Sequence, residues 1–184
     1  MPERAVFLDR DGVVVREIVR DNVAYAPTEL ADFQIVPEAP EQVARLRAAG
    51  FLRIVFTNQP EVAKGLLAPS TLTEMHLRLR ASVDLDEIAV CPHDGQESDP
   101  CVCRKPAPGL LLEAMRRWDI DLSASYVVGD RWRDIGAGQA VGCFSILIDR
   151  PYSQCTTADA RVTSLTEAVD LILIRSQGAQ HGIR

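Results

Sequence analysis

Apolar residues along the chain follow two alternating patterns. In short runs they are nearly continuous, and in longer segments they recur every three or four positions. The short runs predict buried strands, and the longer segments predict amphipathic helices. The expected strands are 5–8, 52–57, 87–91, 125–129 and 144–148, and the expected helices are 38–49, 72–82, 109–118, 133–141 and 165–175. This alternation is typical of a doubly wound α/β fold, which is a mainly parallel sheet with helices on both faces.

Two of the expected helix starts carry a local signal. Thr71 with Glu74, and Ser164 with Glu167, have the S/T-x-x-E spacing in which a hydroxyl and a carboxylate cap the first helical turn. We therefore expect helices to begin near both points.

The alternation is interrupted by the segments 13–36 and 92–104. Both fall at the carboxyl end of a predicted strand, where doubly wound folds place their active sites. With 184 residues, 47% of them hydrophobic, the chain fits one globular domain. We expect this domain over residues 1–176, followed by a polar tail at 177–184.

Composition and charge argue against some classes of function. The net charge is -6, and acidic and basic residues are interspersed, so no basic block is available to follow a nucleic-acid backbone. No segment has the roughly 18 uninterrupted apolar residues of a membrane helix, and the N-terminus runs into a strand-like segment instead of a secretory signal. We expect a cytoplasmic monomer that has neither nucleic acid nor a membrane as a partner.

Two carboxylates follow the first predicted strand. Asp9 and Asp11 are two residues apart, so an extended backbone turns both side chains to one side, and Gly12 then permits a sharp turn. Carboxylates this close repel each other, and a divalent cation such as Mg²⁺, which also binds a substrate phosphate, relieves that repulsion. The same pair can divide the roles of nucleophile and general acid and base in phosphate ester hydrolysis. Taken alone, D-x-D-G also occurs in turns and in calcium loops.

Polar and basic residues follow later elements. Thr57, Asn58 and Gln59 end the second predicted strand, where a hydroxyl and backbone N–H groups can hold phosphoryl oxygens. Arg104 and Lys105 stand just before a helix, and Lys105 offers a compact positive charge to the phosphate and to the nucleophile. Each of these motifs alone is also common in helix caps, turns or solvated surfaces. Each therefore indicates a phosphate site only in combination with the other motifs.

Asp130 and Asp134 follow the fourth predicted strand. A carboxylate at this point lies beside the first strand of a doubly wound sheet, so Asp130 is a candidate for a second side-chain ligand of the cation. We expect Asp134 to support the site by hydrogen bonding, or to reach the metal only through water.

The motifs D-x-D-G, T-N-Q, R-K-P and G-D-x-x-x-D occur in this order over nearly the whole chain. This order resembles the haloacid dehalogenase superfamily of phosphatases with an aspartate nucleophile. The resemblance implies that Asp9 is the nucleophile, and that Asp11 is the general acid and base and binds magnesium through its backbone carbonyl. It also implies that Asp9 and Asp130 are further magnesium ligands, and that Thr57 and Lys105 contact the phosphoryl group.

Three cysteines and one histidine crowd into the second interrupting segment. Cys91, His93, Cys101 and Cys103 supply the number of sulfur and imidazole ligands that a closed tetrahedral zinc site requires. We expect structural Zn²⁺ in the loop 91–103, because this segment is too short and polar to form a core of its own. Four unrelated residues, or a disulfide between two of the cysteines, are the alternatives.

The expected zinc also has a functional consequence. It would fix Arg104 and Lys105, which directly follow the last ligand. The two remaining cysteines, Cys143 and Cys155, stand apart from this group, and we expect reduced thiols without a chemical role.

The zinc loop narrows the resemblance. C-P-H followed by C-V-C-R-K-P resembles the branch that contains D-glycero-D-manno-heptose 1,7-bisphosphate 7-phosphatases and the phosphatase domain of the histidinol-phosphate enzyme, which are compact enzymes without a large cap domain. T-N-Q-P-E-V-A-K-G is closer to the heptose form, T-N-Q-S-G-I-A-R-G, although Pro60 and Glu61 replace Ser and Gly and Lys64 replaces Arg. The resemblance therefore implies removal of the 7-phosphate from a heptose bisphosphate.

Several residues are candidates for contact with the remainder of such a substrate. Arg104, Lys64 and Arg131 are candidate ligands of a second phosphate, with Asn58 and Gln59 as further substrate contacts. Surface positions without a role are the alternative for the basic residues, above all for Lys64.

Other functions remain open at this level. The rival enzymes are histidinol-phosphate phosphatase and polynucleotide 3′-phosphatase, and the acidic balance of the chain counts against the second. Outside enzymes, the chain could be a zinc-stabilised binding module with a degenerate site. The intact set of catalytic motifs argues against that reading, since a binding protein needs no nucleophile and acid side by side.

Overall fold

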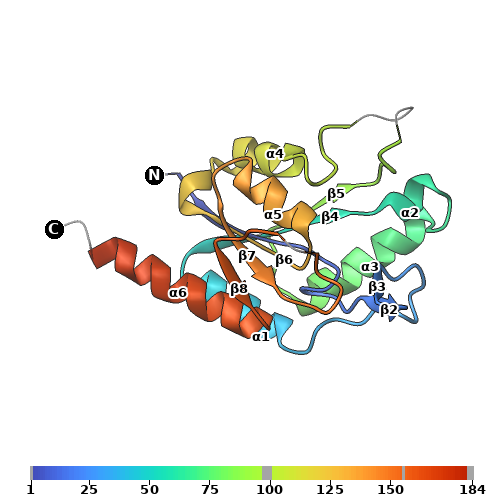
Figure 1. Ribbon diagram of the computed structural model, residues 1–184, viewed down its shortest axis with the longest axis horizontal. Helices are drawn as coiled ribbons and strands as arrows, with labels where there is room; N and C mark the ends of the chain where they lie inside the picture. The colour runs from blue at the N-terminus through green and yellow to red at the C-terminus, as the bar shows by residue number, and fades with distance from the viewer. Residues whose placement is uncertain (1, 97–100, 155, 182–184) are drawn as a thin grey trace.

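A parallel sheet forms the centre of the computed structural model, which describes residues 2–96, 101–154 and 156–181 (Figure 1). Its strands are β1 (Arg4–Leu8), β4 (Phe51–Asn58), β5 (Glu87–Cys91), β6 (Tyr126–Gly129), β7 (Phe144–Ile148) and β8 (Ala160–Val162). They lie in the order β5-β4-β1-β6-β7-β8, and every neighbouring pair is parallel. The doubly wound α/β fold expected from the sequence is confirmed.

The first strand shows why the short runs are continuously apolar. In β1, Val6 and Leu8 belong to one buried cluster, and Ala5 and Phe7 belong to the other. All four side chains are fully buried. Successive residues of a strand point to opposite faces, so a strand that is covered on both faces needs an apolar residue at every position.

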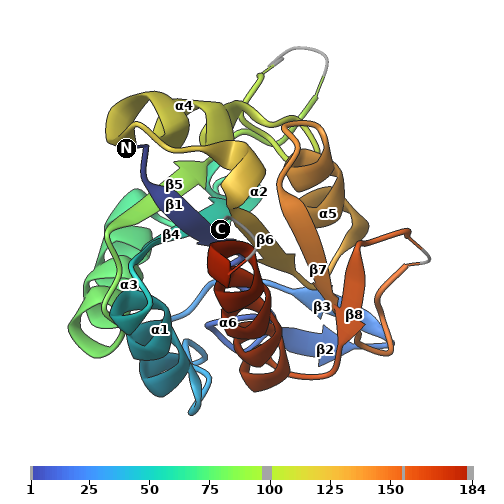
Figure 2. The same cartoon turned by 90° about the vertical axis from the view of Figure 1, so that its left-hand side faces the viewer.

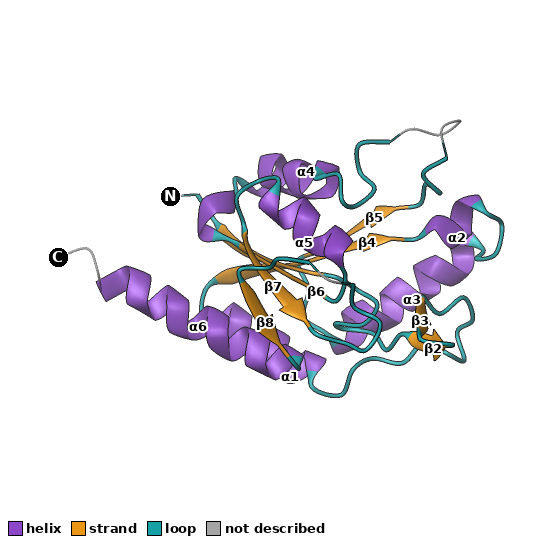
Figure 3. Cartoon of the chain, viewed as in Figure 1, coloured by secondary structure: helices purple, strands orange, loops and turns teal. Residues whose placement is uncertain are grey.

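Helices pack against both faces of the sheet (Figures 2 and 3). They are α1 (Ala39–Ala48), α2 (Pro60–Ala63), α3 (Pro69–Ser82), α4 (Gly109–Trp118), α5 (Trp132–Gln139) and α6 (Leu165–His181), with a short 3-10 helix at Leu122–Ala124. Residues of α1, α3 and α6 share one buried cluster, and residues of α4 and α5 share the other. Because all six strands run the same way, the connections that leave their carboxyl ends meet at one edge of the sheet.

A β-hairpin occupies the long connection after β1. Its strands, β2 (Ile18–Arg20) and β3 (Val23–Tyr25), pair antiparallel, and the two residues between them, Asp21 and Asn22, have φ of 49° and 58°. A tight two-residue hairpin requires this left-handed backbone, and Asp and Asn tolerate it better than most residues. The hairpin was not predicted because strands of three residues are too short to show an alternating pattern. The short elements α2 and β8 were missed for the same reason.

The two expected helix caps had different outcomes. Helix α3 begins at Pro69, so Thr71 lies inside the first turn and the capping prediction there was wrong. Proline suits the first helical position because its φ is already helical and its missing N–H is not needed. At α6, Ser164 Oγ accepts the N–H of Glu167 at 3.1 Å, which confirms the start of the helix at this point.

The last helix is longer than expected. Helix α6 continues past the predicted end at residue 175 to His181, so the segment expected to be a polar tail from residue 177 begins as helix. Within the described residues, no helix is both long and apolar enough to span a membrane.

Candidate active site

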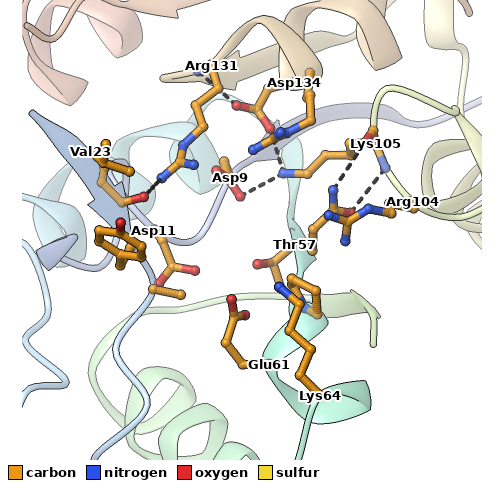
Figure 4. A pocket seen from close by; sticks show the side chains of 16 residues that line it. Asp9, Asp11, Val23, Thr57, Glu61, Lys64, Arg104, Lys105, Arg131 and Asp134 are labelled. Atoms are coloured by element: carbon orange, nitrogen blue, oxygen red, sulfur yellow. Dashed lines mark hydrogen bonds and ion pairs between the residues drawn. The ribbon is translucent and has the colours of Figure 1, made fainter. Parts of the chain in front are cut away.

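A cavity of about 270 Å³ opens at the carboxyl ends of β1 and β4 (Figure 4). Its wall contains the carboxylate pair after β1, residues at the end of β4, residues of the hairpin strand β3 and several basic side chains. Both segments that interrupt the strand and helix alternation contribute to it. This cavity therefore lies at the carboxyl edge of the sheet, where the active site was expected.

Lys105 links two carboxylates at the floor of this cavity. Its Nζ lies 2.7 Å from Asp9 Oδ1 and 2.6 Å from Asp134 Oδ1, and it donates to the carbonyl of Phe56 at 3.0 Å. The exposed fractions of the three charged side chains are only 3%, 10% and 2%. An ammonium held between two buried carboxylates has little freedom to turn, so it fixes the orientation of Asp9.

Burial shifts the pKa values of this group. Burial and the neighbouring charge of Asp134 raise the pKa of Asp9 to about 7, while Lys105 acts in the opposite direction. Burial and the charge of Asp9 raise the pKa of Asp130 well above its usual range. Burial by itself lowers the pKa of Lys105, but Asp134 and Asp9 more than offset this effect and the pKa is raised. The floor therefore holds more carboxylates than its one ammonium can neutralise.

The spacing of these carboxylates fits a divalent cation. One oxygen from each of Asp9, Asp130 and Asp134 lies within 4.8 Å of the other two. Asp130 is fully buried, and its Oδ1 has no hydrogen-bond partner within the described part of the chain. Arg131 Nε lies 3.9 Å from this oxygen, which is too far for a hydrogen bond. A buried carboxylate oxygen that accepts no hydrogen bond is costly, and such an oxygen is a good ligand for a hard cation such as Mg²⁺. Gly12 leaves room for this group, because a Cβ at that position would lie 2.2 Å from Asp130 Oδ2.

The predicted magnesium ligands are thus only partly brought together by their carboxylates. Asp9 and Asp130 lie in one group, whereas the carboxylate of Asp11 is outside it, and its ligation through the backbone carbonyl stays a prediction. Asp134 makes the hydrogen bonds expected of it: Oδ2 accepts the backbone N–H of Arg131 at 3.0 Å. Its Oδ1 pairs with Lys105.

Asp130 is held by two residues that were not selected from the sequence, Tyr152 and Ser153. The hydroxyl of Tyr152 donates to Asp130 Oδ2 at 2.8 Å, and the hydroxyl of Ser153 donates to the Asp130 carbonyl at 2.6 Å. Both residues lie in the loop after β7, separated from Asp130 by 22 and 23 positions. No local pattern connects positions that far apart, so the sequence offered no signal for this support.

Hydrogen bonds fix both oxygens of Asp11. Arg10 Nε donates to Oδ1 at 3.0 Å, and Gln59 Nε2 donates to Oδ2 at 2.9 Å. The same Gln59 nitrogen donates to Thr57 Oγ1 at 2.8 Å, and Gln59 Oε1 accepts from Arg10 Nη2 at 2.9 Å. Arg10 and Gln59 are fully buried. The candidate acid and base is therefore held from behind by two rigid side chains, of which Arg10 was not predicted.

The two polar residues after Thr57, both predicted to contact substrate, make hydrogen bonds within the protein. Gln59 is not among the residues that line the cavity, and its amide is engaged by Asp11 and Thr57. These hydrogen bonds give it a supporting role, and its direct contact with substrate stays a prediction. Asn58 lines the cavity, but its side chain brackets the backbone of Lys105: Nδ2 donates to the carbonyl at 3.2 Å and Oδ1 accepts the N–H at 3.1 Å. Asn58 thus positions Lys105.

Basic side chains line the mouth of the cavity. The predicted residues Lys64, Arg104 and Arg131 are there, together with Arg133, which was not selected from the sequence. Arg104 and Arg131 each donate to a backbone carbonyl, at 2.9 and 2.7 Å. Burial and the nearby charge of Arg131 lower the pKa of Arg133. The place of Arg133 inside the G-D-x-x-x-D motif was a signal that was available. Crowded guanidinium groups above this floor suit a substrate with a second anionic group.

The predicted cysteine and histidine ligands also converge. Cys91 Sγ lies 3.7 Å from Cys101 Sγ and 3.5 Å from His93 Nδ1, and His93 Nδ1 lies 3.3 Å from Cys103 Sγ. Tetrahedral zinc, with bonds of about 2.3 Å to sulfur and about 2.1 Å to nitrogen, separates its ligands by roughly 3.5 to 3.8 Å, so the arrangement fits such an ion. All three cysteines are free, which excludes the disulfide alternative.

The cluster is connected to the cavity through Arg104, whose Nη1 donates to the carbonyl of His93 at 2.9 Å. Residues 97–100 of the expected zinc loop, and Cys155, lie outside the described residues. Cys143 is a free, buried thiol, and burial raises its pKa to about 12. That it has no chemical role stays a prediction.

Known proteins resemble the chain in sequence and in fold. A family model of HAD-hydrolase-like proteins matches residues 102–168. The chain is 32% identical, over 95% of its length and 97% of the relative, to a D-glycero-beta-D-manno-heptose-1,7-bisphosphate 7-phosphatase of Bordetella bronchiseptica. A protein of the same name from Escherichia coli is 34% identical and is matched over 96% of this chain and 97% of its own. The crystal structure of D,D-heptose 1.7-bisphosphate phosphatase from B. bronchiseptica, complexed with magnesium and phosphate, superposes with a TM-score of 0.78 at 28% identity, covering 94% of this chain and 99% of that one.

Proposed function

The chain belongs to the haloacid dehalogenase-like (HAD-like) phosphatases, in the family of the D-glycero-D-manno-heptose-1,7-bisphosphate 7-phosphatases, and from this premise we propose that it hydrolyses the 7-phosphate of such a heptose bisphosphate through an aspartyl-phosphate on Asp9. The main support is the ammonium of Lys105, which bridges Asp9 and Asp134 at the floor of the cavity. A nucleophile that is already held in one orientation beside the reacting group loses little further entropy when the transition state forms.

In the first step, an oxygen of Asp9 forms a bond to phosphorus while the bond between phosphorus and the sugar oxygen breaks. We expect Lys105 and Thr57 to contact the phosphoryl oxygens, which is supported by the ion pair between Lys105 and Asp9 and by the position of Thr57 in the lining of the same cavity. Fixed positive charge and hydroxyl dipoles at this point stabilise the charge that develops during transfer.

Asp11 moves the protons of both steps. It gives a proton to the sugar oxygen as that oxygen leaves, and it then takes a proton from the water that attacks the aspartyl-phosphate. This second attack releases inorganic phosphate and restores the carboxylate of Asp9. The bonds from Arg10 and Gln59 to the two oxygens of Asp11 support this role, because they hold the carboxylate in one plane.

We assign a magnesium site to Asp9 and Asp130, with the backbone carbonyl of Asp11 as a further ligand. The three clustered carboxylates support this assignment, as does Asp130 Oδ1, which accepts no hydrogen bond from any residue that the structure describes. When bound, Mg²⁺ neutralises part of the charge on the phosphoryl oxygens and the carboxylates. Asp134 contributes by fixing Lys105 and the backbone of Arg131.

We assign structural zinc to Cys91, His93, Cys101 and Cys103. The ligand spacing supports it, and four protein ligands leave no open position for a substrate. Its contribution to activity is indirect, since the loop it closes ends at Arg104.

The second phosphate of the substrate is expected to bind the guanidinium groups at the mouth of the cavity. Arg104, Arg131 and Arg133 approach the cavity from two different connections, and Lys64 approaches from α2. Guanidinium groups bind phosphate through paired N–H donors, so a bisphosphate gains a contact there that a monophosphate lacks.

We further propose that the enzyme is a cytoplasmic monomer. Thiolate ligands of zinc persist in a reducing compartment, which supports the location. Sedimentation equilibrium of the purified protein tests the monomer, and a mass of twice the chain's 20.3 kDa would contradict it.

Phosphate release from a substrate panel tests the proposed function. The panel contains heptose 1,7-bisphosphate, fructose 1,6-bisphosphate, histidinol phosphate and a 3′-phosphorylated oligonucleotide, each with and without magnesium. We expect magnesium-dependent turnover with a clear preference for the heptose bisphosphate. Preference for histidinol phosphate would replace the substrate, and turnover of no compound would favour a binding module.

The covalent step needs a separate test. Beryllium trifluoride should form an adduct on Asp9, and an Asp9→Asn variant should lose turnover. An adduct on another residue, or normal turnover in the variant, would contradict the aspartyl-phosphate route.

A further inference from the structure

Glu61 presents an unpaired carboxylate oxygen at the cavity. Its side chain lines the wall, and Oε2 is buried without a hydrogen-bond partner among the residues the structure describes. Figure 4 shows this carboxylate turned toward the space between Asp11 and Thr57. A buried carboxylate oxygen without a donor is costly, so a group that donates to it when the cavity is filled would gain from the contact.

The backbone holds this carboxylate in a fixed place. Glu61 lies in the short helix α2, and its carbonyl accepts the N–H groups of Leu66 and Leu67 at 2.8 and 3.0 Å. Leu67 is buried, so the turn that ends α2 is anchored in the core. Because the backbone of Glu61 is anchored, its carboxylate can accept a hydrogen bond only from a donor at a defined position in the cavity.

The charges around Glu61 restrict the kind of group it can accept. Asp11 faces the same space, so a second phosphate placed there would be repelled by two carboxylates. Arg131 approaches from the opposite side of the cavity, and the exposed Lys64 makes no hydrogen bond to Glu61 Oε2. A neutral hydroxyl fits this environment, because it donates a charge-assisted hydrogen bond to a carboxylate without bringing negative charge.

We infer that Glu61 is a specificity-determining residue that accepts a hydrogen bond from the hydroxyl on the carbon next to the phosphoester carbon. The inference rests on the proposed function, because Asp11 and Thr57 mark the position of the reacting phosphoryl group and the hydroxyl must lie close to it. In heptose 1,7-bisphosphate this group is the 6-hydroxyl. Glu61 is also a position where the sequence departs from T-N-Q-S-G-I-A-R-G, in which a glycine offers no such acceptor.

A comparison of heptose 1,7-bisphosphate with its 6-deoxy analogue tests this inference. We expect the protein to prefer the parent compound by about 10- to 100-fold in kcat/KM, since a hydrogen bond to a charged group is lost in the analogue. Glu61→Ala should remove the preference, so that kcat/KM for the parent compound falls to that of the 6-deoxy analogue measured with the same variant. Glu74→Gln, at a half-exposed glutamate of α3, is the matched control and should keep the preference.

Two results of these turnover measurements would overturn the inference. One is a Glu61→Ala variant that keeps the preference for the parent compound over the 6-deoxy analogue. Glu61→Gln is measured beside it, and thermal melting confirms that both variants are folded. The other is a Glu61→Ala variant that loses more kcat/KM for histidinol phosphate than for the heptose bisphosphate. Histidinol phosphate carries an ammonium group, in place of a hydroxyl, on the carbon next to the phosphoester carbon. That result would assign Glu61 to an ammonium instead of a hydroxyl.

Failure of the proposed function is distinguishable from failure of this inference. If the unmodified protein releases phosphate from neither the heptose bisphosphate nor acetyl phosphate, the proposed function is wrong. Calorimetric binding to the Asp9→Asn protein still tests Glu61: the 6-deoxy compound should bind at least about tenfold more weakly, and adding Glu61→Ala should abolish the difference. Equal binding of the two compounds to the Asp9→Asn protein would overturn the inference.

Discussion

The side-chain amide of Gln59 donates to Asp11 Oδ2 at 2.9 Å and, from the same nitrogen, to Thr57 Oγ1 at 2.8 Å. Asp11 follows β1 and Thr57 belongs to β4, which are neighbouring strands of the sheet. One buried amide therefore ties the candidate acid and base to the candidate phosphate-binding hydroxyl.

Replacing Gln59 by Leu should slow turnover without weakening substrate binding. The variant keeps the volume but removes the donor to a charged carboxylate, so kcat should fall about 10- to 100-fold. KM should change little, because Gln59 is not among the residues that line the cavity. Steady-state phosphate release measures both constants, and Gln34→Leu at an exposed position is the control. A raised KM with an unchanged kcat would show that Gln59 contacts substrate after all.

Lys105→Met should abolish turnover and destabilise the fold. It leaves the carboxylates of Asp9 and Asp134 buried without their counter-charge, which costs roughly 3 to 5 kcal/mol when one partner of a buried ion pair is removed. Phosphate release and urea unfolding measure the two effects. Lys64→Met is the comparison, and we expect less than about a tenfold loss there because its side chain is exposed. A stable, active Lys105→Met protein would rule out the bridging role.

Without added magnesium, the free energy of unfolding should fall as the pH rises from about 4 to about 7. Burial and Asp134 raise the pKa of Asp9 to about 7, so in this window the folded state holds a proton that the unfolded state has released. Raising the pH removes that proton from the folded state, and the free energy of unfolding falls.

Asp9→Asn isolates this effect because it cannot titrate. Its stability relative to the unmodified protein should increase between pH 5 and pH 7.5 by roughly 2 to 4 kcal/mol, at about 1.4 kcal/mol per unit of pKa shift. Urea unfolding at both pH values measures the difference, and saturating magnesium should reduce it. Parallel pH dependence in the two proteins would mean that Asp9 is not the titrating group.

Cys101→Ser should remove zinc and impair turnover together. Cys101 Sγ lies 3.7 Å from Cys91 Sγ in the ligand cluster, and the loop leads directly into Arg104 and Lys105. Zinc content per chain and phosphate release are measured on the same sample. Cys143→Ala is the control, since that thiol is buried outside the cluster and should leave the zinc in place. Full activity in a zinc-free protein would contradict the proposed coupling.

Arg133→Ala should weaken the binding of a bisphosphate more than that of a monophosphate. Arg133 lines the mouth of the cavity close to Arg131, where the second phosphate is proposed to bind. We expect KM for the heptose bisphosphate to rise about tenfold, with little change for the 7-monophosphate. The exposed Arg78 on α3 supplies the control variant, Arg78→Ala. Equal effects on both compounds would place the second phosphate elsewhere.

The strands of the parallel sheet were predictable because a strand that is buried on both faces has apolar residues at consecutive positions. The segments 87–91 and 144–148 were predicted with the same bounds that β5 and β7 have. The hairpin of β2 and β3 was not, although Asp21 and Asn22 have the residue types that its tight turn favours. Three-residue strands on the surface need no continuous apolar run, so their positions leave little trace in the sequence.

The convergence of the site also followed from the order of motifs along the chain. Parallel strands bring their carboxyl ends to one edge, so Asp9, Thr57 and Asp130 had to lie near one another once the fold was known. The four zinc ligands were close in sequence and needed only one loop to bring them together.

Side-chain direction was decided by tertiary packing alone. Gln59 turns inward to Asp11, and Tyr152 reaches Asp130 from a distant loop. Glu61 points into the cavity, where its Oε2 accepts no hydrogen bond within the described part of the chain. The sequence by itself determined which chemical groups reach the edge of the sheet, because that depends on local patterns and chain order. Only the tertiary structure decided which of them face the substrate and which support a neighbour, because each orientation depends on contacts between residues far apart in the chain.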